Sequence, residues 1–285
     1  MTAVLLDRMP VAGVDMRYLQ AGPVEASAAV VFVHGNPGSA DDWRALVATV
    51  GEHGRAVALD MPDFGQTAAA PGFEHTVDGY AGFLAQALSA LGIDSVHLVL
   101  HDFGGPFGLA WAGGNLAALQ SVTLIDTGFL PGYRWHTLAR IWRTPLLGEA
   151  FQAITTRRTF RSAISRGEPR GLPRSFLDGM YDCYGPRTKQ AVLKLYRATD
   201  DPGRGAELAP ALAELDIPAL VIWGEHDRYI PASYAARQRE AFPSADIHVL
   251  PASGHWPHVD APYAVRRLLV DFLAPRLDAA ASASG

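Results

Sequence analysis

Three side chains that can attack carbon or move a proton each follow a short apolar run of the sequence. They are Asp102, Asp227 and His255, after the runs 96–100, 219–222 and 247–250. A carboxylate is anionic at neutral pH and is suited to displacement at a saturated carbon that carries a leaving group or belongs to a strained ring. A histidine oriented by a second carboxylate is suited to taking a proton from water. The pattern predicts attack by Asp102, followed by hydrolysis of the ester by water that His255 activates and Asp227 supports.

The surroundings of Asp102 favour a sharp turn from a strand into a helix. The segment Val99-Leu100-His101-Asp102-Phe103-Gly104-Gly105 joins an apolar run to a helical pattern. Such a turn exposes its central side chain above a sheet and needs small residues close by. Taken alone, Asp102 has a second interpretation, as the N-cap of the following helix. The remaining motifs favour the catalytic interpretation.

A second turn, His34-Gly35-Asn36-Pro37-Gly38-Ser39, follows the apolar run 30–33. A backbone N–H of this turn, paired with the N–H of Phe103, would form an oxyanion hole. We expect Asn36 and Phe103 to supply it, and His34 and Pro37 to contact the substrate. The plain alternative is a polar loop that leaves a strand.

The acid and the histidine lie in the segments Gly224-Glu225-His226-Asp227 and Ser253-Gly254-His255, each at the end of an apolar run. Open α/β sheets place their sites at such ends. A surface turn and a structural histidine are the alternatives, and His258 is the stronger candidate for a structural role. Asp126, which follows the run 122–125, is held in reserve as the acid partner.

Short apolar runs alternate with helical patterns along most of the chain. The runs 30–33, 55–59, 96–100, 122–125 and 219–222 are almost continuously apolar, and helical spacing occupies 41–50, 77–91, 106–118 and 234–242. Continuous apolar strands are typical of parallel sheets that are covered on both faces. We predict an α/β fold with a mostly parallel central sheet flanked by helices.

The alternation stops in the middle of the chain. Residues 128–215 carry aromatic and arginine residues at helical spacing and no convincing strand. We predict a core of residues 1–127 and 216–275, a helical cap of residues 128–215, and a disordered Ala/Ser-rich tail of residues 276–285.

The composition excludes several classes of protein. The 285 residues are 49% hydrophobic and carry 24 basic and 29 acidic residues, which argues against disorder and against a basic surface for nucleic acid. The single Cys183 can form neither an internal disulfide nor a multi-thiolate metal site. The apolar runs are too short for a membrane span or a signal peptide. We expect a cytoplasmic enzyme without cofactor or metal.

The order Asp102, Asp227, His255, together with both turns and the segment 61–67, resembles the α/β-hydrolase superfamily over about residues 10–275. With an aspartate at the turn, the chain is similar to two branches, the epoxide hydrolases and the haloalkane dehalogenases. The resemblance implies hydrolysis without a cofactor and a helical lid before the acid-bearing strand, where residues 128–215 lie.

The leaving group distinguishes the two branches. Dehalogenases hold halide with a tryptophan N–H directly after the nucleophile, helped by an asparagine or a second tryptophan. Asn36 fits this pattern, but Phe103 has no side-chain N–H, so Trp135 or Trp142 would have to replace it.

Epoxide hydrolases protonate the ring oxygen with lid tyrosines, and Tyr196 in Leu195-Tyr196-Arg197 resembles one of these. A second donor stays open among Tyr133, Tyr181 and Tyr184, each of which could instead only pack in the lid. We predict an epoxide hydrolase first, with Trp135 and Tyr133 in the substrate site. A haloalkane dehalogenase is second, and a non-catalytic binding protein on this scaffold is third.

Charge is divided unevenly between the predicted cap and core. Residues 128–215 hold 14 of the 24 basic and 8 of the 29 acidic residues. One interpretation is docking of the cap through exposed ion pairs, worth less than about 1 kcal/mol each. The other is a small apolar substrate of anionic or electron-rich character. The sequence leaves the oligomeric state open.

Overall fold

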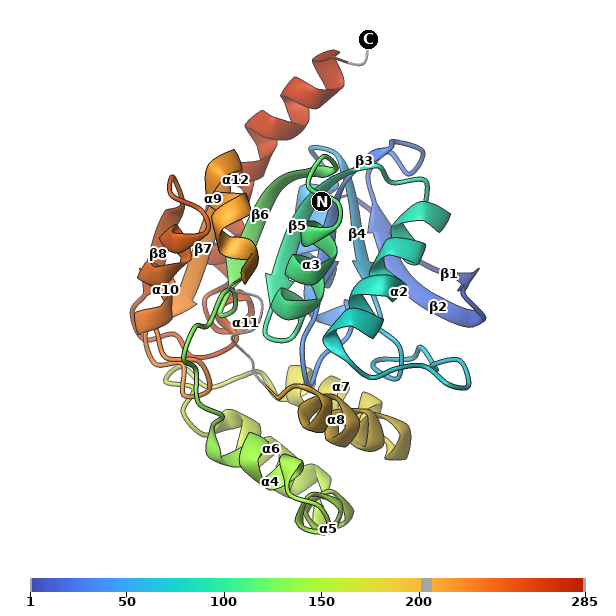
Figure 1. Ribbon diagram of the computed structural model, residues 1–285, viewed down its shortest axis with the longest axis vertical. Coiled ribbons are helices and arrows are strands. Elements are labelled where there is room, and N and C mark those ends of the chain that lie inside the picture. Colours follow the sequence, from blue (N-terminus) through green and yellow to red (C-terminus); the bar gives the residue numbers. More distant parts are fainter. Residues whose placement is uncertain (1, 201–206, 284–285) are drawn as a thin grey trace.

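Eight strands form one sheet in the computed structural model, which describes residues 2–200 and 207–283 (Figure 1). The strands are β1 (Leu5–Val11), β2 (Val14–Ala21), β3 (Ala28–Val33), β4 (Arg55–Leu59), β5 (Ser95–His101), β6 (Leu119–Ile125), β7 (Ala219–Gly224) and β8 (Asp246–Leu250). Their order is β1-β2-β4-β3-β5-β6-β7-β8. The pairs β1–β2 and β2–β4 are antiparallel, and all other pairs are parallel. The predicted fold class is confirmed.

The six parallel strands are those that the apolar runs predict. Most are buried along their length because helices cover both faces of the sheet. The N-terminal hairpin of β1 and β2 was not predicted. β1 lies at the edge of the sheet and is largely exposed, so its sequence lacks a continuous apolar run.

Helices pack on the two faces of the sheet as separate layers. One face is covered by α1 (Arg44–Val50) and α12 (Pro262–Ala283), whose side chains share a core with Trp43 of the 3₁₀ helix η1 (Ala40–Trp43). The other is covered by α2 (Val77–Ala90), α3 (Gly104–Gly113), α9 (Ala209–Leu215), α10 (Ser233–Arg237) and the 3₁₀ helix η3 (Gln238–Glu240) (Figure 1). The short helix α11 (Pro257–Asp260) precedes α12.

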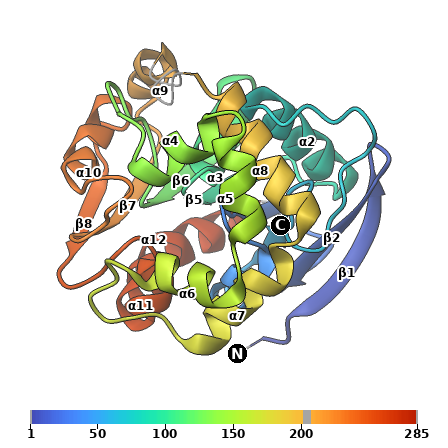
Figure 2. The same cartoon turned by 90° about the horizontal axis from the view of Figure 1, so that it is seen from below.

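Five further helices lie between β6 and β7 in the sequence and cover the carboxyl ends of the parallel strands (Figure 2). They are α4 (Thr137–Arg143), α5 (Leu147–Ile154), α6 (Arg157–Ser165), α7 (Arg174–Cys183) and α8 (Pro186–Ala198). We refer to α4–α8 and their connections as the cap. Helix α9, inside the predicted cap range 128–215, instead packs against η3 beside the sheet.

The predicted disordered tail of residues 276–285 is wrong for most of its length. Helix α12 continues to Ala283, and residues 284–285 lie outside the described part. Alanine has the highest helix propensity, so the Ala-rich segment extends a helix that is already anchored on the sheet. No helix in the described ranges is both long and apolar enough to cross a membrane.

Candidate active site

Asp102 occupies the turn between β5 and α3 with a φ angle of +49°. A residue other than glycine in this region costs about 1–3 kcal/mol and persists only where its surroundings enforce it. The surroundings here are tight: a Cβ on Gly35 would lie 2.3 Å from Asp102 Oδ1, and one on Gly104 would lie 2.2 Å from the Val33 carbonyl oxygen. The Thr127 hydroxyl donates to the Asp102 carbonyl at 2.6 Å. The turn therefore presents the carboxylate above the sheet.

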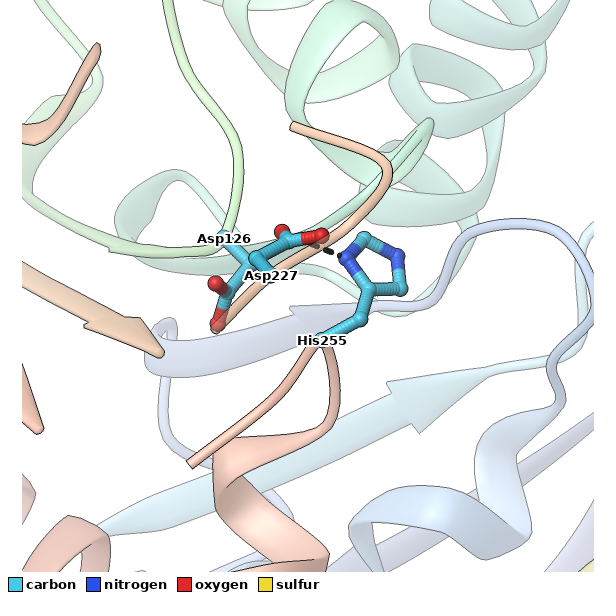
Figure 3. A group of neighbouring side chains, drawn as sticks. All are labelled: Asp126, Asp227 and His255. Carbon is cyan, nitrogen blue, oxygen red and sulfur yellow. Dashed lines mark hydrogen bonds and ion pairs between the residues drawn. The ribbon is translucent and has the colours of Figure 1, made fainter. Parts of the chain in front are cut away.

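His255 lies between the carboxylates of Asp102 and Asp227. Its Nδ1 is 2.8 Å from Asp227 Oδ2, the contact drawn in Figure 3, and its Nε2 is 3.5 Å from Asp102 Oδ2. Asp227 Oδ1 accepts the backbone N–H groups of Tyr229 and Ile230 at 2.7 and 3.0 Å. The three residues come from turns after β5, β7 and β8, so the sheet brings together the residues that the sequence predicts.

The charges of this group favour an ionised nucleophile. Burial alone would raise the pKa of Asp102, but the hydrogen bond and charge of His255 outweigh burial and lower that pKa to about 2. Burial would lower the pKa of His255, but the Asp227 and Asp102 carboxylates raise it well above its ordinary value. In the resting site the imidazolium is thus stabilised between two carboxylates.

Asp126, the reserve acid, lies beside Asp227 rather than against the imidazole in Figure 3. Its Oδ1 accepts the Gly224 N–H at 2.9 Å, and its Oδ2 is buried without a hydrogen-bond partner among the described residues. Burial and the neighbouring Asp227 charge raise the pKa of Asp126 well above its ordinary value. These observations favour Asp227 as the acid partner and a neutral Asp126.

Asp126, Asp227 and His255 also form a group of potential metal ligands, whose atoms lie within 4.8 Å of one another. The Asp227 oxygens and His255 Nδ1 already hydrogen-bond each other or backbone N–H groups. We therefore assign the group to proton transfer.

The turn after β3 contributes a donor to the nucleophile. The Asn36 N–H donates to Asp102 Oδ1 at 2.7 Å, as an oxyanion hole requires. Phe103 packs its ring against the site, and its N–H as the second donor stays a prediction. His34 is buried and accepts the Met61 N–H at Nε2, 3.1 Å away, so it ties the turn to the segment after β4 and, unlike Pro37, lines neither cavity beside Asp102.

Tyr196 places its hydroxyl near Asp102. The Asn36 side-chain amide donates to that hydroxyl at 3.4 Å. Burial, and then the Asp102 charge, raise the pKa of Tyr196 well above its ordinary value, so the phenol holds its proton. Phe103 and Trp142 each pack edge-on against the Tyr196 ring, with centroids 4.9 Å apart.

The other tyrosines differ in position. Tyr133 lines the cavity that contains Asp102, but its hydroxyl donates to the Tyr229 carbonyl at 2.8 Å. Tyr184 is buried in the cap, where its hydroxyl accepts from the Gln152 amide, and Tyr181 packs under Arg157. Tyr181 and Tyr184 therefore have packing roles, and Tyr133 stays the candidate for a second donor.

Two cavities adjoin Asp102. The larger, of about 580 Å³, lies between α3 and the cap and is lined by Asp102, Tyr196, Trp135 and His136 among others. The smaller, of about 20 Å³, lies between Asp102 and His255 and is also lined by Pro37 and Trp142. Its volume suits one water molecule.

The positive charge of the cap does not face the larger cavity. Its charged lining residues within the described ranges are all acidic: Glu74, Asp78, Asp102, Asp200 and Glu207. Cap arginines instead pair largely within the cap, as Arg197 does with Glu149 at 2.7 Å, while Arg187 reaches Asp63 of the core at 3.3 Å. The lining argues against the anionic substrate that the charge division suggested.

Sequence reasoning missed two buried groups that hold the histidine. The Glu168 carboxylate, from the cap connection after α6, accepts the His255 N–H at 3.1 Å, and burial raises the pKa of Glu168 to about 7. His101 Nε2 contacts the His255 carbonyl at 2.8 Å. The position of His101 directly before Asp102 was the available signal, whereas nothing near Glu168 in the sequence marks it.

His136 and Tyr229 were also missed. His136 caps α4 by accepting the Ala139 N–H at Nδ1, 3.2 Å away, which leaves Nε2 to carry the ring proton. Burial lowers the pKa of His136 to about 4, so it is a neutral donor in the cavity lining. The Tyr229 ring packs edge-on against His255, 5.0 Å between centroids.

Comparison with known proteins agrees with this architecture. The sequence profile of a family described as alpha/beta hydrolase fold matches residues 28–262. The chain is 28% identical over 270 residues to the cis-3-alkyl-4-alkyloxetan-2-one decarboxylase of Xanthomonas campestris, covering 86% of this chain and 87% of the relative.

Two solved structures are also similar. One is the haloalkane dehalogenase DbeA from Bradyrhizobium elkani, with a TM-score of 0.83, 23% identity, and coverage of 98% of this chain and 100% of that one. The other is the Cif epoxide hydrolase from Acinetobacter nosocomialis, with a TM-score of 0.81, 19% identity, and coverage of 95% and 89%. At these identities the structures support the fold and not a particular activity.

Proposed function

The chain belongs to the alpha/beta hydrolase fold family, and on this premise we propose that it is an epoxide hydrolase with Asp102 as its nucleophile. The observation that carries the proposal is that an ionised Asp102, a protonated Tyr196 hydroxyl and His255, which Asp227 holds, meet at the small cavity beside the nucleophile. No step requires a cofactor.

The first step opens the ring. Asp102 Oδ1 is held by the Asn36 N–H, so Oδ2 attacks a ring carbon, forms a C–O ester bond and displaces the ring oxygen. The ring oxygen takes the Tyr196 proton. Alkylation removes the negative charge of Asp102. Since that charge raises the pKa of Tyr196, its loss lowers this pKa and makes the phenol a better acid.

The second step hydrolyses the ester. With Asp102 alkylated, His255 loses one of its two carboxylate partners and its pKa falls, so the imidazolium gives up its proton, which restores the Tyr196 phenol, and the neutral imidazole becomes a base for water. The small cavity between Asp102 and His255 suits that water. Water attacks the Asp102 carbonyl carbon while the Asn36 N–H stabilises the charge on Oδ1. The imidazolium gives the proton taken from water to the product oxygen, which leaves as an alcohol. The imidazole then takes the proton of the new Asp102 carboxyl, so Asp102, His255 and Tyr196 return to their starting protonation states.

A relative supports a strained oxygen ring as the substrate. The oxetan-2-one in the name of the Xanthomonas protein is a four-membered cyclic ester, whereas an epoxide is a three-membered cyclic ether. Displacement at a ring carbon by a carboxylate relieves strain in both.

A haloalkane dehalogenase is the second candidate, and a specific observation favours it. The indole N–H groups of Trp135 and Trp142 are buried without a hydrogen-bond partner among the described residues, and each lines a cavity beside Asp102. Halide would accept from them or from the Asn36 amide. A binding protein without catalysis is third, and the intact His255–Asp227 pair argues against it.

Replacing His255 with Gln tests the proposal, since alkylation proceeds while hydrolysis stops. Intact mass is recorded after exposure to alkyl epoxides and to bromoalkanes. We expect a stable adduct on Asp102 with epoxides. An adduct with bromoalkanes alone favours the dehalogenase, and no adduct with either class contradicts the aspartate mechanism. His226→Gln, an exposed histidine one residue from Asp227, is the control and should accumulate no adduct.

A further inference from the structure

The larger cavity follows one face of α3 away from the nucleophile. Its lining includes Phe103, Pro106, the adjacent pair Leu109 and Ala110, and Gly113, so that the lining recurs every three or four residues. These positions share a face of the helix. Pro106, Ala110 and Gly113 are only half-buried, so their small side chains leave space along the helix. The cavity is therefore elongated, with Asp102 at the start of α3.

The length and volume exceed what a small epoxide needs. At about 1.5 Å per residue, Phe103 to Gly113 spans about 15 Å, the length of about a dozen methylenes. The opposite wall is largely apolar and includes Phe129, Leu130, Leu208 and Ile230. A linear apolar chain matches this shape better than a compact ring system.

The far end carries negative charge. Glu207 precedes Leu208, whose side chain lies against Gly113 at the last turn of α3. Glu74, three residues before α2, and Asp78, in the first turn of α2, also line the cavity and are exposed, but α2 begins on the cap side, as α3 does (Figure 1), so Glu207 is the carboxylate placed at the far end. A carboxylate at the end of a bound chain would meet the like charge of Glu207 there.

We propose that this cavity is a channel for an unbranched alkyl chain with an uncharged end, so that the substrate is a long-chain epoxide without a carboxylate. The epoxide in this assignment rests on the proposed function, whereas the alkyl channel rests on the cavity alone. Methylenes along α3 leave water for an apolar wall, and affinity rises with each until the chain passes Gly113.

Calorimetric titration of the full chain with unreactive alcohols tests the channel. We expect the Kd to fall by up to about fourfold for each methylene added from hexan-1-ol to decan-1-ol. Decanoate at low salt should bind at least about fivefold more weakly than decan-1-ol. A Kd that does not depend on chain length, or equal binding of decanoate, overturns the proposal.

Ala110→Phe places a ring part-way along the channel and should weaken decan-1-ol binding at least about tenfold. Ala117→Phe, an exposed position beyond the end of α3, is the matched control and should leave binding unchanged. Unaltered binding by a folded Ala110→Phe variant overturns the proposal, and if that variant does not fold, the alcohol series with the unmodified chain still decides.

The alcohols do not react, so these titrations separate the two proposals. A clear chain-length series without any epoxide adduct on His255→Gln rejects the proposed function and keeps the channel. An epoxide adduct with a flat alcohol series keeps the function and rejects the channel.

Discussion

Asp126 offers a quantitative check on the electrostatics of the site. It is fully buried beside Asp227, and burial together with that neighbouring charge raises its pKa well above the ordinary value. In the unfolded chain the same carboxyl ionises near pH 4. Above about pH 4, folding therefore requires Asp126 to take up a proton. The free-energy cost of that uptake grows as the pH rises, so the buried carboxyl lowers the stability of the folded chain more at higher pH.

Asp126→Asn removes that cost with little change in shape. The amide oxygen can accept the Gly224 N–H that Asp126 Oδ1 accepts at 2.9 Å, and the amide nitrogen can donate toward Asp227. Above about pH 4, the free energy of unfolding of Asp126→Asn minus that of the unmodified chain should rise by about 1.4 kcal/mol per pH unit. The rise should stop when the pH reaches the folded-state pKa of Asp126.

Urea unfolding at pH 5, 6 and 7 measures this difference. Asp94→Asn, an exposed aspartate in the turn before β5, is the control, and its difference should stay flat. A flat difference for Asp126→Asn, or one that falls with pH, would show that Asp126 is ionised in the folded protein and would refute the assignment of the charge to Asp227.

Two further predictions concern groups around the triad. Tyr196→Phe removes the proposed acid and should slow epoxide opening by about 100-fold or more in single-turnover kinetics, while any dehalogenation stays nearly unchanged; equal losses would contradict its role. Glu168 has a raised pKa of about 7, so its carboxyl must hold a proton in the folded chain at a pH where it would ionise in the unfolded chain. The stability of the unmodified chain relative to Glu168→Gln should therefore fall as the pH rises from about 5 to 7 and stay constant above that. Thermal unfolding measures this difference. A difference that does not change with pH would contradict a Glu168 that ionises in this range.

The parallel sheet and the order of its motifs were predictable because continuous apolar runs and sharp turns are local features of the sequence. The α/β fold class and six of the strands are confirmed. The edge strand β1 was not predictable in the same way, since an exposed edge requires no apolar run. The tail was mispredicted because composition alone does not show that α12 anchors it.

The rest of the site depends on contacts between distant segments. Asn36 and Tyr196 are 160 residues apart, and Glu168 and His255 are 87 apart. The turn motif predicts that His255 lies at the end of a strand. Only the packing of the cap on the core brings Glu168 to the His255 N–H. The uneven charge division does not extend to the cavity, because cap arginines pair largely within the cap and the charged lining residues that the structure describes are acidic.

Whether Asp102 forms an ester that water then cleaves can be measured in one turnover of an alkyl epoxide in water enriched in oxygen-18, with enzyme in excess. Because water attacks the ester carbonyl, we expect heavy oxygen in the Asp102 carboxylate, found by mass spectrometry of the peptide, and a first-turnover diol without label. A labelled diol with an unlabelled Asp102 peptide would mean that water attacks the ring directly, and would contradict the ester.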